Sequence, residues 1–319
     1  MRAVWLKEFG GPEVLLPGEA PDPAAGAGEA LIAVTYANIT FVETQMRAGG
    51  GPGPGRPQLP LIPGNGVGGV VLAVGEGVDG DLVGARVATS LGGSGGYAER
   101  VTVAASAPFD VPDAVALDEA VALLADGRTA TALIHAAGVR EGDRVLVEAA
   151  AGGVGSLLVQ LARNAGAHVV AVAGGARKVA LAADLGAQHA FDNSSPDWAD
   201  RVRDAVGAVD VVFDGVGGEI GATAYSLLDG GGRFLSYGLA SGAWTSVSEK
   251  DAAARGVTVR RGPLGTPEEL RGFTQSVLEA AAAGHVKPVV GQRFPLEQAA
   301  DAHHAIESRT TVGKTLLVV

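Results

Sequence analysis

The sequence predicts an α/β protein in which a β-rich segment precedes a doubly wound parallel sheet. Three observations support this prediction. Residues 1–117 contain short alternating or β-branched runs bounded by glycine and proline. From residue 118 onward, helical and strand patterns alternate. Within that alternation, residues 145–163 (VLVEAAAGGVGSLLVQLAR) have the order strand, glycine turn, helix, which is the layout of a dinucleotide-binding unit.

The composition is that of a compact folded protein and limits the classes of partner. The chain has 319 residues, enough for two domains, and 47% of them are hydrophobic. A net charge of −11 argues against nucleic acid or an anionic membrane as the main partner, because both require a basic surface. The start of the chain lacks the apolar segment of a signal peptide, and no apolar run is long enough to span a membrane. We therefore expect a cytoplasmic protein.

The sequence also argues against a metal site. It contains no cysteine, which excludes disulfides and zinc sites with thiolate ligands. Its six histidines form no HxxxH or HExxH pair, and adjacent His303 and His304 would point in different directions on a helix. We expect no metal.

The first segment is predicted to be mostly strand. Residues 29–40 (EALIAVTYANIT) alternate, and residues 66–78 and 84–91 are short β-branched runs between glycines. Residues 48–60 (AGGGPGPGRPQLP) contain too many glycines and prolines for a helix or a strand. We predict a loop there, which is either functional or a surface insertion.

The second segment is predicted to alternate between helix and strand. It opens with a helix over residues 117–138, with Asp118 as its N-cap and Gly138 as its end. The expected strands are 144–149, 168–173, 189–192, 209–214, 232–237 and 256–261, and the expected helices between them are 154–165, 176–185, 197–205 and 218–228. Two further helices, within 266–286 and 296–308, and a strand over 313–319 complete the chain. Such alternation specifies a parallel sheet with helices on both faces.

The turn at residues 149–155 is the candidate cofactor site. Backbone N–H groups at the start of a helix form an anion site. Gly152 permits the backbone to approach a pyrophosphate, and Gly155 permits close packing of helix on strand. Ala150 occupies the position of the usual first glycine. A glycine-rich turn of another doubly wound fold is the alternative, but the strand before, the helix after and the further βα units favour a dinucleotide.

The end of the second strand distinguishes NAD from NADPH. An NAD site places an acidic residue there to accept hydrogen bonds from the ribose hydroxyls. This sequence has Gly174, Gly175, Ala176, Arg177 and Lys178 instead. Two cations without an acid suit a 2′-phosphate, although they could also be an ordinary solvated helix start. The pattern favours NADPH.

Several stretches together resemble one family. They are EAAAGGVGSLLVQLAR (148–163), DVVFDGVGG (210–218), GGRFLSYG (231–238), GGYAE (95–99), VVLAVGEGV with VGARV (70–87) and the terminal GKTLLVV. In this order they resemble the NADPH-dependent quinone oxidoreductases, the ζ-crystallin-like, zinc-free branch of the medium-chain dehydrogenase/reductase superfamily. The resemblance covers essentially the whole chain.

The resemblance implies a two-domain architecture. Residues 1–117 and 264–319 would form a GroES-like β-barrel domain that carries catalytic residues. Residues 118–263 would form a Rossmann domain that binds NADPH. Members of the family are commonly dimers or tetramers joined through the edge strand of the Rossmann sheet, here 256–261, so we expect a homodimer.

The resemblance also implies roles for single residues. Gly152, Gly153 and Val154 would contact the pyrophosphate, and Lys178 would pair with the 2′-phosphate, assisted by Arg177. The other positions implied near the cofactor are Asn193, Val216, Gly217, Tyr237, Gly238, Arg309 and Lys314. Asn38 and Thr129 would lie close to the nicotinamide, and with Tyr36 they are candidate donors to a substrate oxygen.

Three positions depart from the family pattern. Asn193, followed by Ser194, replaces the usual tyrosine near the 2′-phosphate, which weakens the NADPH preference. Gly174 replaces a serine or threonine at the end of the second strand. Gly66 replaces a glutamate that belongs to the zinc-site neighbourhood in metal-dependent relatives, in keeping with a metal-free site.

The implied reaction needs little protein chemistry. A hydride passes from the nicotinamide to an electrophilic carbon, and donors stabilise the charge that develops on the carbonyl oxygen. The substrate would be a quinone or, alternatively, an α,β-unsaturated carbonyl, as in a 2-alkenal or enoyl reductase. The sequence does not separate these two. A non-enzymatic NADPH-binding regulatory or structural role is the third possibility.

Overall fold

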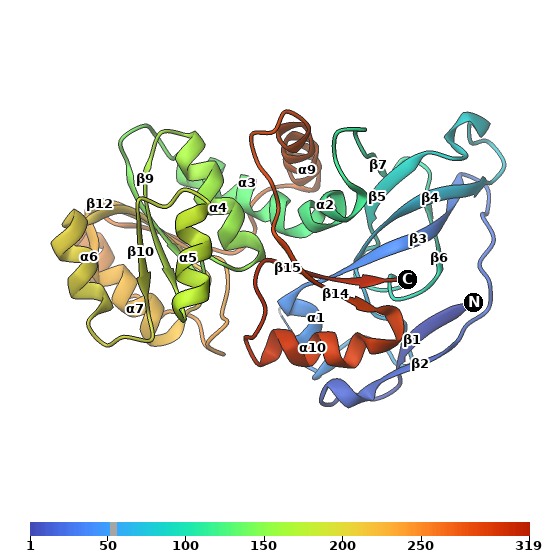
Figure 1. The fold of residues 1–319 in the computed structure, drawn as a ribbon, viewed down its shortest axis with the longest axis horizontal. Coiled ribbons are helices and arrows are strands. Elements are labelled where there is room, and N and C mark those ends of the chain that lie inside the picture. Colours follow the sequence, from blue (N-terminus) through green and yellow to red (C-terminus); the bar gives the residue numbers. More distant parts are fainter. Residues whose placement is uncertain (52–55) are drawn as a thin grey trace. The chain divides into compact units, whose positions relative to one another are not determined.

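The computed structural model describes residues 1–51 and 56–319, so part of the loop expected at 48–60 lies outside the described residues. The chain divides into two units, and Figure 1 labels many of their helices and strands. Unit 1 comprises Met1–Ala125 and Leu278–Val319, and unit 2 comprises Asp126–Val277. The two boundaries expected from the sequence, 117/118 and 263/264, both lie earlier in the chain than the observed ones. The first does so because Leu117 and Val121 pack against Gly68 of unit 1.

Unit 1 is a β structure built from both ends of the chain. Its main sheet has the order β14-β15-β3-β4-β5-β7, with β6 also paired to β3. These strands are β3 (Glu29–Ile39), β4 (Gly66–Val74), β5 (Arg86–Ser90), β6 (Arg100–Ala104), β7 (Phe109–Asp110), β14 (Val290–Pro295) and β15 (Lys314–Val318), and a separate pair is formed by β1 (Arg2–Leu6) and β2 (Leu15–Glu19). Because β15 pairs antiparallel with β3, the C-terminal strand completes the sheet that the N-terminal segment begins.

In the described part of unit 1, three α-helices and three short 3₁₀ turns accompany these strands. The helices are α1 (Phe41–Arg47), α2 (Leu117–Ala122) and α10 (Ala299–Glu307), and the 3₁₀ turns are η1 (Pro12–Val14), η2 (Gly80–Leu82) and η4 (Leu296–Gln298). Helix α1 and strand β14 were not expected from the sequence. The start of α1 is fixed by Glu43, whose carboxylate accepts hydrogen bonds from the backbone N–H of Thr40 and from that of Asn65.

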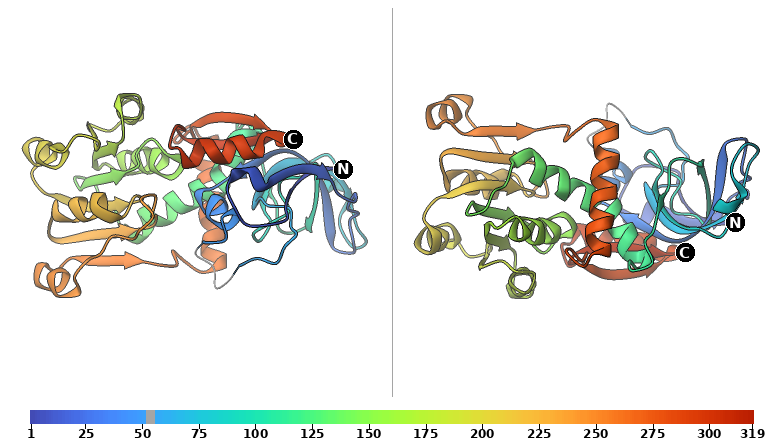
Figure 2. Two further views of the ribbon diagram at one scale, coloured as in Figure 1. Left: turned by 90° about the horizontal axis from the view of Figure 1, so that it is seen from below. Right: turned by 90° about the horizontal axis from the view of Figure 1, so that it is seen from above.

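Unit 2 contains a six-stranded parallel sheet of the Rossmann type. Its order is β10-β9-β8-β11-β12-β13, and Figure 2 shows helices on both faces. The strands are β8 (Arg144–Glu148), β9 (His168–Ala173), β10 (His189–Asp192), β11 (Val209–Asp214), β12 (Leu228–Ser236) and β13 (Thr258–Arg261), and the helices are α3 (Arg128–Ala137), α4 (Gly153–Asn164), α5 (Ala176–Asp184), α6 (Trp198–Val206), α7 (Gly218–Ser226), α8 (Glu249–Arg255) and α9 (Pro267–Ala282), the last of which extends into unit 1. Fully buried Leu146, Val170 and Phe234 form the centre of its core. The predicted α/β class with a doubly wound parallel sheet is confirmed.

The single helix expected over 117–138 is interrupted. Helix α2 ends at Ala122, a π-helical segment covers Leu123–Gly127, and α3 continues to Ala137, where Gly138 ends it in the left-handed conformation as expected (φ 57°). The prediction that Asp118 is the N-cap was wrong, because the cap position is Ala116. Asp118 instead lies in the first turn, where its carboxylate pairs with Arg293.

Candidate functional site

The turn that joins β8 to α4 is tightly built. Ala149 adopts a left-handed conformation (φ 47°), and its carbonyl accepts a hydrogen bond from the N–H of Gly152 at 2.8 Å. A Cβ at Gly155 would lie 2.2 Å from that carbonyl oxygen, so only glycine lets α4 pack this closely on the strand end. Ala150 is fully buried and donates to the carbonyl of Val172 at 3.1 Å. Its position in the turn therefore does not require glycine.

The first turn of α4 has the features of an anion site. The helix begins after Gly152, which is in an extended conformation (φ −83°, ψ 177°) and has no side chain that could cap the helix. Gly152, Gly153 and Val154 are partly exposed. A Cβ at Gly153 would lie 1.9 Å from Oδ2 of Asp126, so a larger residue there would displace this carboxylate. N–H groups in the first turn of a helix can bind a phosphate, and the aligned helix dipole favours a negative charge there.

The outer edge of this region is formed by the ends of β9 and β10. Arg177 is exposed and Lys178 half-buried at the start of α5, and the side chain of Asn193 lies next to Gly174. The sequence interpretation missed Asp192, at the end of β10. Its carboxylate accepts hydrogen bonds from the N–H of Gly175 at 2.9 Å and from the N–H and hydroxyl of Ser194 at 2.9 and 2.7 Å.

These contacts define the role of Asp192. The hydrogen bond from Gly175, followed by those from Ser194, lowers the pKa of the Asp192 carboxyl. The same contacts hold the segment that precedes Arg177 and Lys178 in place. Segment 174–178 itself contains no acidic residue, but Asp192 at the end of β10 contacts the backbone of this segment at Gly175. This contact depends on sheet order, and no pattern within 174–178 could have revealed it.

The turn after β11 is organised around the buried carboxylate of Asp214. It accepts hydrogen bonds from the backbone N–H groups of Val216 (3.2 Å) and Gly217 (2.7 Å) and from the hydroxyls of Ser236 (2.8 Å) and Thr245 (2.7 Å). Gly217 has a φ of 74°, and a Cβ there would lie 2.1 Å from the carbonyl oxygen of Ala243. Both its conformation and its surroundings therefore require glycine.

Glu148, at the end of β8, meets the same turn from the neighbouring strand. Its side chain is 0% exposed, and Oε2 accepts a hydrogen bond from the N–H of Val216 at 3.1 Å. Burial raises the pKa of the Glu148 carboxyl well above its ordinary value, and the nearby Asp214 raises it further. The sequence interpretation did not single out Glu148. The signal was an acid directly after the buried run Val145–Val147.

Tyr237 and Gly238 follow β12 and cover this turn. A Cβ at Gly215 would lie 2.6 Å from the Tyr237 hydroxyl, and one at Gly238 would lie 2.6 Å from the carbonyl oxygen of Gly215. Burial raises the pKa of the Tyr237 hydroxyl, and Glu148 is the next cause. Tyr237 and Gly238 therefore lie against the turn that contains Val216 and Gly217. All four come from the carboxyl ends of adjacent strands.

The remaining candidate residues are divided between the units. Thr129 belongs to α3 of unit 2 and is partly buried. Tyr36, Asn38, Arg309 and Lys314 belong to unit 1.

Asn38 has the least ordinary environment of those in unit 1. It is 2% exposed, and its Oδ1 has no hydrogen-bond partner among the described residues. A Cβ at Gly66 would lie 2.5 Å from its Nδ2, so this glycine makes room for the amide. Lys314 is buried on β15, and Arg309 adopts a left-handed conformation (φ 57°). Tyr36 is partly exposed on β3.

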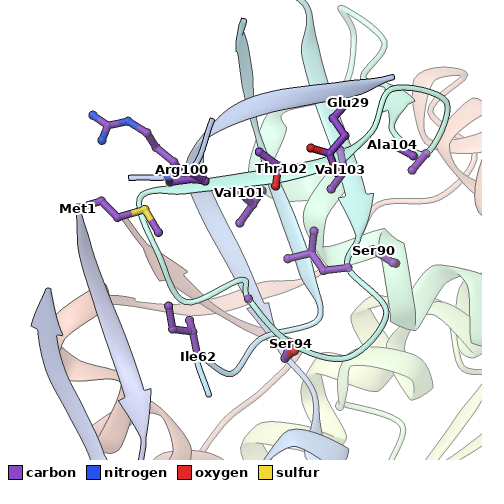
Figure 3. Close-up of a pocket in the computed structure, with 14 residues that line it drawn as sticks. Met1, Glu29, Ile62, Ser90, Ser94, Arg100, Val101, Thr102, Val103 and Ala104 are labelled. Atoms are coloured by element: carbon purple, nitrogen blue, oxygen red, sulfur yellow. The ribbon is translucent and has the colours of Figure 1, made fainter. Parts of the chain in front are cut away.

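Each unit also contains a cavity. In unit 2, a cavity of about 250 Å³ lies beside Leu133, Ser236 and residues 259–264. In unit 1, a pocket of about 470 Å³ is shown in Figure 3. Its charged side chains are already engaged: Arg100 pairs with Asp22, and Glu29 accepts a hydrogen bond from the N–H of Gly26 at 2.9 Å. The unit 1 pocket therefore offers no cluster of groups suited to catalysis.

Over residues 1–51 and 56–319, no three His, Asp or Glu side chains are arranged so that they could hold a metal ion. No helix in the same residues is both long and apolar enough to cross a membrane.

Comparison with known proteins identifies the family. A model of the alcohol dehydrogenase GroES-like domain matches residues 26–113, and a zinc-binding dehydrogenase model matches residues 185–317. A quinone oxidoreductase of Rattus norvegicus is 33% identical over 326 residues, covering 100% of this chain and 98% of the relative. A 2-haloacrylate reductase of a Burkholderia species is 32% identical over 330 residues, covering 99% of this chain and 98% of the relative.

A solved structure agrees with these relatives. The Escherichia coli quinone oxidoreductase, crystallised with NADPH, superimposes with a TM-score of 0.90 at 30% identity, covering 100% of both chains. Because the sequence matches over its full length and the fold matches over both units, the chain belongs to the quinone oxidoreductase family of the medium-chain dehydrogenase/reductase superfamily.

Proposed function

We propose that the chain is an NADPH-dependent quinone oxidoreductase that works without a metal ion. The observation that carries the proposal is the carboxyl edge of the unit 2 sheet, where the glycine-lined start of α4 and the turn at 214–217 follow adjacent strands. The Escherichia coli relative with this fold was solved with NADPH, and the rat relative is named as a quinone oxidoreductase. NADPH, when bound, supplies the hydride that reduces the acceptor.

The residues of unit 2 would hold the cofactor. The N–H groups of Gly152, Gly153 and Val154 would bind the pyrophosphate. Lys178, with Arg177, would bind the 2′-phosphate, because a cation and charge-assisted hydrogen bonds suit a dianion. The remaining positions that we propose for the nucleotide and its riboses are Gly155, Asn193, Val216, Gly217, Tyr237 and Gly238, with Arg309 and Lys314 contributed by unit 1.

The proposed catalytic residues act on the acceptor oxygen. In unit 2, the Thr129 hydroxyl can donate a hydrogen bond to a carbonyl oxygen that gains negative charge. In unit 1, the Asn38 amide and the Tyr36 hydroxyl can do the same. Asn38 would donate through Nδ2, the group of its buried amide for which Gly66 leaves room. Water can supply the final proton.

An acceptor panel tests the enzymatic role. NADPH absorbance is followed with 1,4-benzoquinone, 9,10-phenanthrenequinone and the enone 3-penten-2-one, and kcat/KM is compared. We expect the quinones to be reduced faster than the enone. Tight NADPH binding without oxidation by any acceptor would contradict an enzyme and favour a regulatory or structural NADPH-binding protein.

Reduction of a carbon–carbon double bond beside a carbonyl is the second candidate function. The 32% identity with the Burkholderia 2-haloacrylate reductase over nearly the whole chain favours it. The cofactor site would be the same for both reactions. A kcat/KM for 3-penten-2-one or 2-chloroacrylate above that of every quinone would establish this candidate in place of the first.

Lys178 provides the test of cofactor choice. We expect Lys178→Ala to raise the Kd of NADPH about 10- to 100-fold, because a charge-assisted contact with the 2′-phosphate is lost. The Kd of NADH should change little. Lys250→Ala, which removes an exposed lysine of α8, is the matched control. An equal loss of affinity for both cofactors would show that Lys178 does not bind the 2′-phosphate.

We also propose a cytoplasmic homodimer that forms through β13. All four residues of this strand are exposed, and its outer edge pairs with no other strand of the described residues. Such an edge can extend a sheet into a second copy. Light scattering should give the mass of a dimer for the native protein and of a monomer for Val259→Lys. A native monomer would contradict the proposal.

A further inference from the structure

Two buried carboxyl groups share one backbone donor at the centre of the unit 2 sheet. Glu148 ends β8, and Asp214 ends β11, the strand beside it. Both side chains are 0% exposed. The N–H of Val216 lies 3.1 Å from Oε2 of Glu148 and 3.2 Å from Oδ1 of Asp214, so the two carboxyl groups face each other across this donor.

The hydrogen bonds around the pair show which carboxyl group keeps the negative charge. Asp214 accepts from four donors, two backbone N–H groups and two hydroxyls, which together stabilise a carboxylate. Glu148 accepts only from Val216, and its Oε1 is buried without a partner among the described residues. Two adjacent carboxylates that are both fully buried cannot both remain ionised. Of the two carboxyl groups, Glu148 is therefore the one that carries a proton.

The surrounding elements do not supply a charge that would neutralise a second carboxylate here. Tyr237, after β12, lies in the field of Glu148, Asp214 and Asp126 of the π-helical segment, and among the described residues no cation is seen to act on Tyr237 or on Glu148. Arg128, at the start of α3, interacts with Asp126, and burial lowers the pKa of its guanidinium. An ionised Glu148 would thus face Asp214 and the N–H of Val216, which it shares with Asp214.

We propose that Glu148 is held in its protonated form and is a positioning residue for NADPH: it fixes the turn Asp214–Gly217, and the loss of its proton weakens cofactor binding. This inference rests on the proposed function, because it assigns NADPH to this turn. As an acid, Glu148 donates its proton toward Asp214 and accepts from Val216, so it connects β8 to the turn. As a carboxylate, it repels Asp214 and any phosphate bound at the adjacent start of α4.

The sign of the pH dependence follows from this linkage. If NADPH binds the form with protonated Glu148, its affinity is constant below the pKa of Glu148 in the free protein. Above that pKa the affinity falls, by at most about tenfold per pH unit. A residue that only supports the fold would not make cofactor affinity depend on pH in this way.

Two substitutions separate the proton from the side chain. Glu148→Gln keeps the shape and replaces the acid O–H by an amide N–H, so it imitates the protonated form at every pH. Glu148→Ala removes the connection altogether. The Kd of NADPH is measured by fluorescence titration at constant ionic strength between about pH 6 and about pH 10. We expect a loss of affinity at high pH in the native protein, a flat profile for Gln, and weak binding at every pH for Ala.

The control is Asp210→Asn, which alters a carboxylate at the opposite end of β11 and should leave the native pH profile unchanged. A native profile identical to that of Glu148→Gln would overturn the proposal. The titration of NADPH itself is common to all variants, so it cancels in this comparison.

Infrared difference spectroscopy tests the protonation without any cofactor. The free native protein at neutral pH should show the C=O band of a buried carboxylic acid, and Glu148→Gln should lack that band. Absence of the band from the native protein would overturn the proposal. If no variant binds NADPH at any pH while the band is present, the proposed function and the role in NADPH binding both fail, and the protonated Glu148 stands alone.

Discussion

The two ends of strands β8 and β11 carry opposite kinds of electrostatics. Three residue pairs, from Val145–Val211 to Val147–Phe213, join these strands. One step before them, Arg144 and Asp210 form a two-pronged ion pair with N···O distances of 2.9 and 3.0 Å, each side chain 30% exposed. One step after them, Glu148 and Asp214 bring two acids together with no exposure.

The difference separates an end of the sheet that stabilises the fold from an end whose buried acid costs stability. At the amino end, Arg144 lowers the pKa of Asp210, so this pair stabilises the fold above the unfolded pKa of aspartate. At the carboxyl end, burial raises the pKa of Glu148, so the acid costs stability as the pH rises above its unfolded value. Doubly wound sheets bind ligands at the carboxyl ends of their strands, where Glu148 and Asp214 lie. A role in binding would explain why a pair that costs stability is found there.

The strongest way to break this contrast is Asp214→Ala. The substitution leaves three donors without an acceptor in a buried site, because only the N–H of Val216 keeps Glu148 as its acceptor. We expect a loss of about 3–5 kcal/mol in the free energy of unfolding. Urea denaturation measures the loss. Ser236→Ala, which removes one donor together with its hydrogen bond, should cost about 1 kcal/mol. An equally small loss for Asp214→Ala would show that Asp214 is not the centre of the turn.

Gly155→Ala tests whether the same end of the sheet tolerates any added volume. The new Cβ would lie 2.2 Å from the carbonyl oxygen of Ala149, and the resulting shift of α4 should cost about 1–3 kcal/mol and weaken NADPH binding. Gly272→Ala is the matched control, because a Cβ on this α9 glycine has no neighbour within 4 Å. That control should stabilise the helix by about 0.5–1 kcal/mol. Calorimetry and a cofactor titration of both variants decide the point.

Glu148→Gln tests, through the free energy of unfolding, whether the acid at the carboxyl end of the sheet costs stability. In the native protein Glu148 keeps its proton, whereas in the unfolded chain it loses it above its ordinary pKa. The native protein is therefore destabilised as the pH rises from that value toward the folded pKa, and the Gln variant is not. We expect the variant to be about 1–2 kcal/mol more stable at pH ~8, with a difference that shrinks toward pH ~5. Equal stabilities at both pH values would contradict a raised pKa for Glu148.

The sequence predicted most of unit 2 because its parallel strands are buried on both faces and appear as unbroken apolar runs. Strands β9, β10 and β11 begin and end at the predicted residues. Helix α1 was missed because it is short, although Thr40 and Glu43 carry the signature of a capping box. The π-helical segment Leu123–Gly127 was missed, although Asp126 and Gly127 interrupt the apolar pattern within it.

The site was predicted in part for a related reason. Glycines and cations near one turn are local in the sequence, so the β8–α4 turn and the Arg177–Lys178 edge could be identified. The contacts of Asp214 with Glu148 and Thr245 join segments far apart in the sequence, and they depend on which strands become neighbours. Asp192 was missed in the same way, because it reaches Gly175 only across β9 and β10.

Asp210→Asn is the mildest change, and it tests the stabilising end. The variant keeps an oxygen for the N–H of Arg144 but loses the charge that pairs with the guanidinium. Because both partners are 30% exposed and Arg144 also reaches Asp229 at 3.2 Å, we expect a loss of only about 0.5–1 kcal/mol. The loss should shrink in about 1 M salt, where screening acts over about 3 Å, and it should vanish at low pH as the native Asp210 takes up a proton. Urea denaturation of both proteins in low and high salt measures this. A loss that is large and insensitive to salt would mean that the amino end, like the carboxyl end, depends on a buried carboxylate.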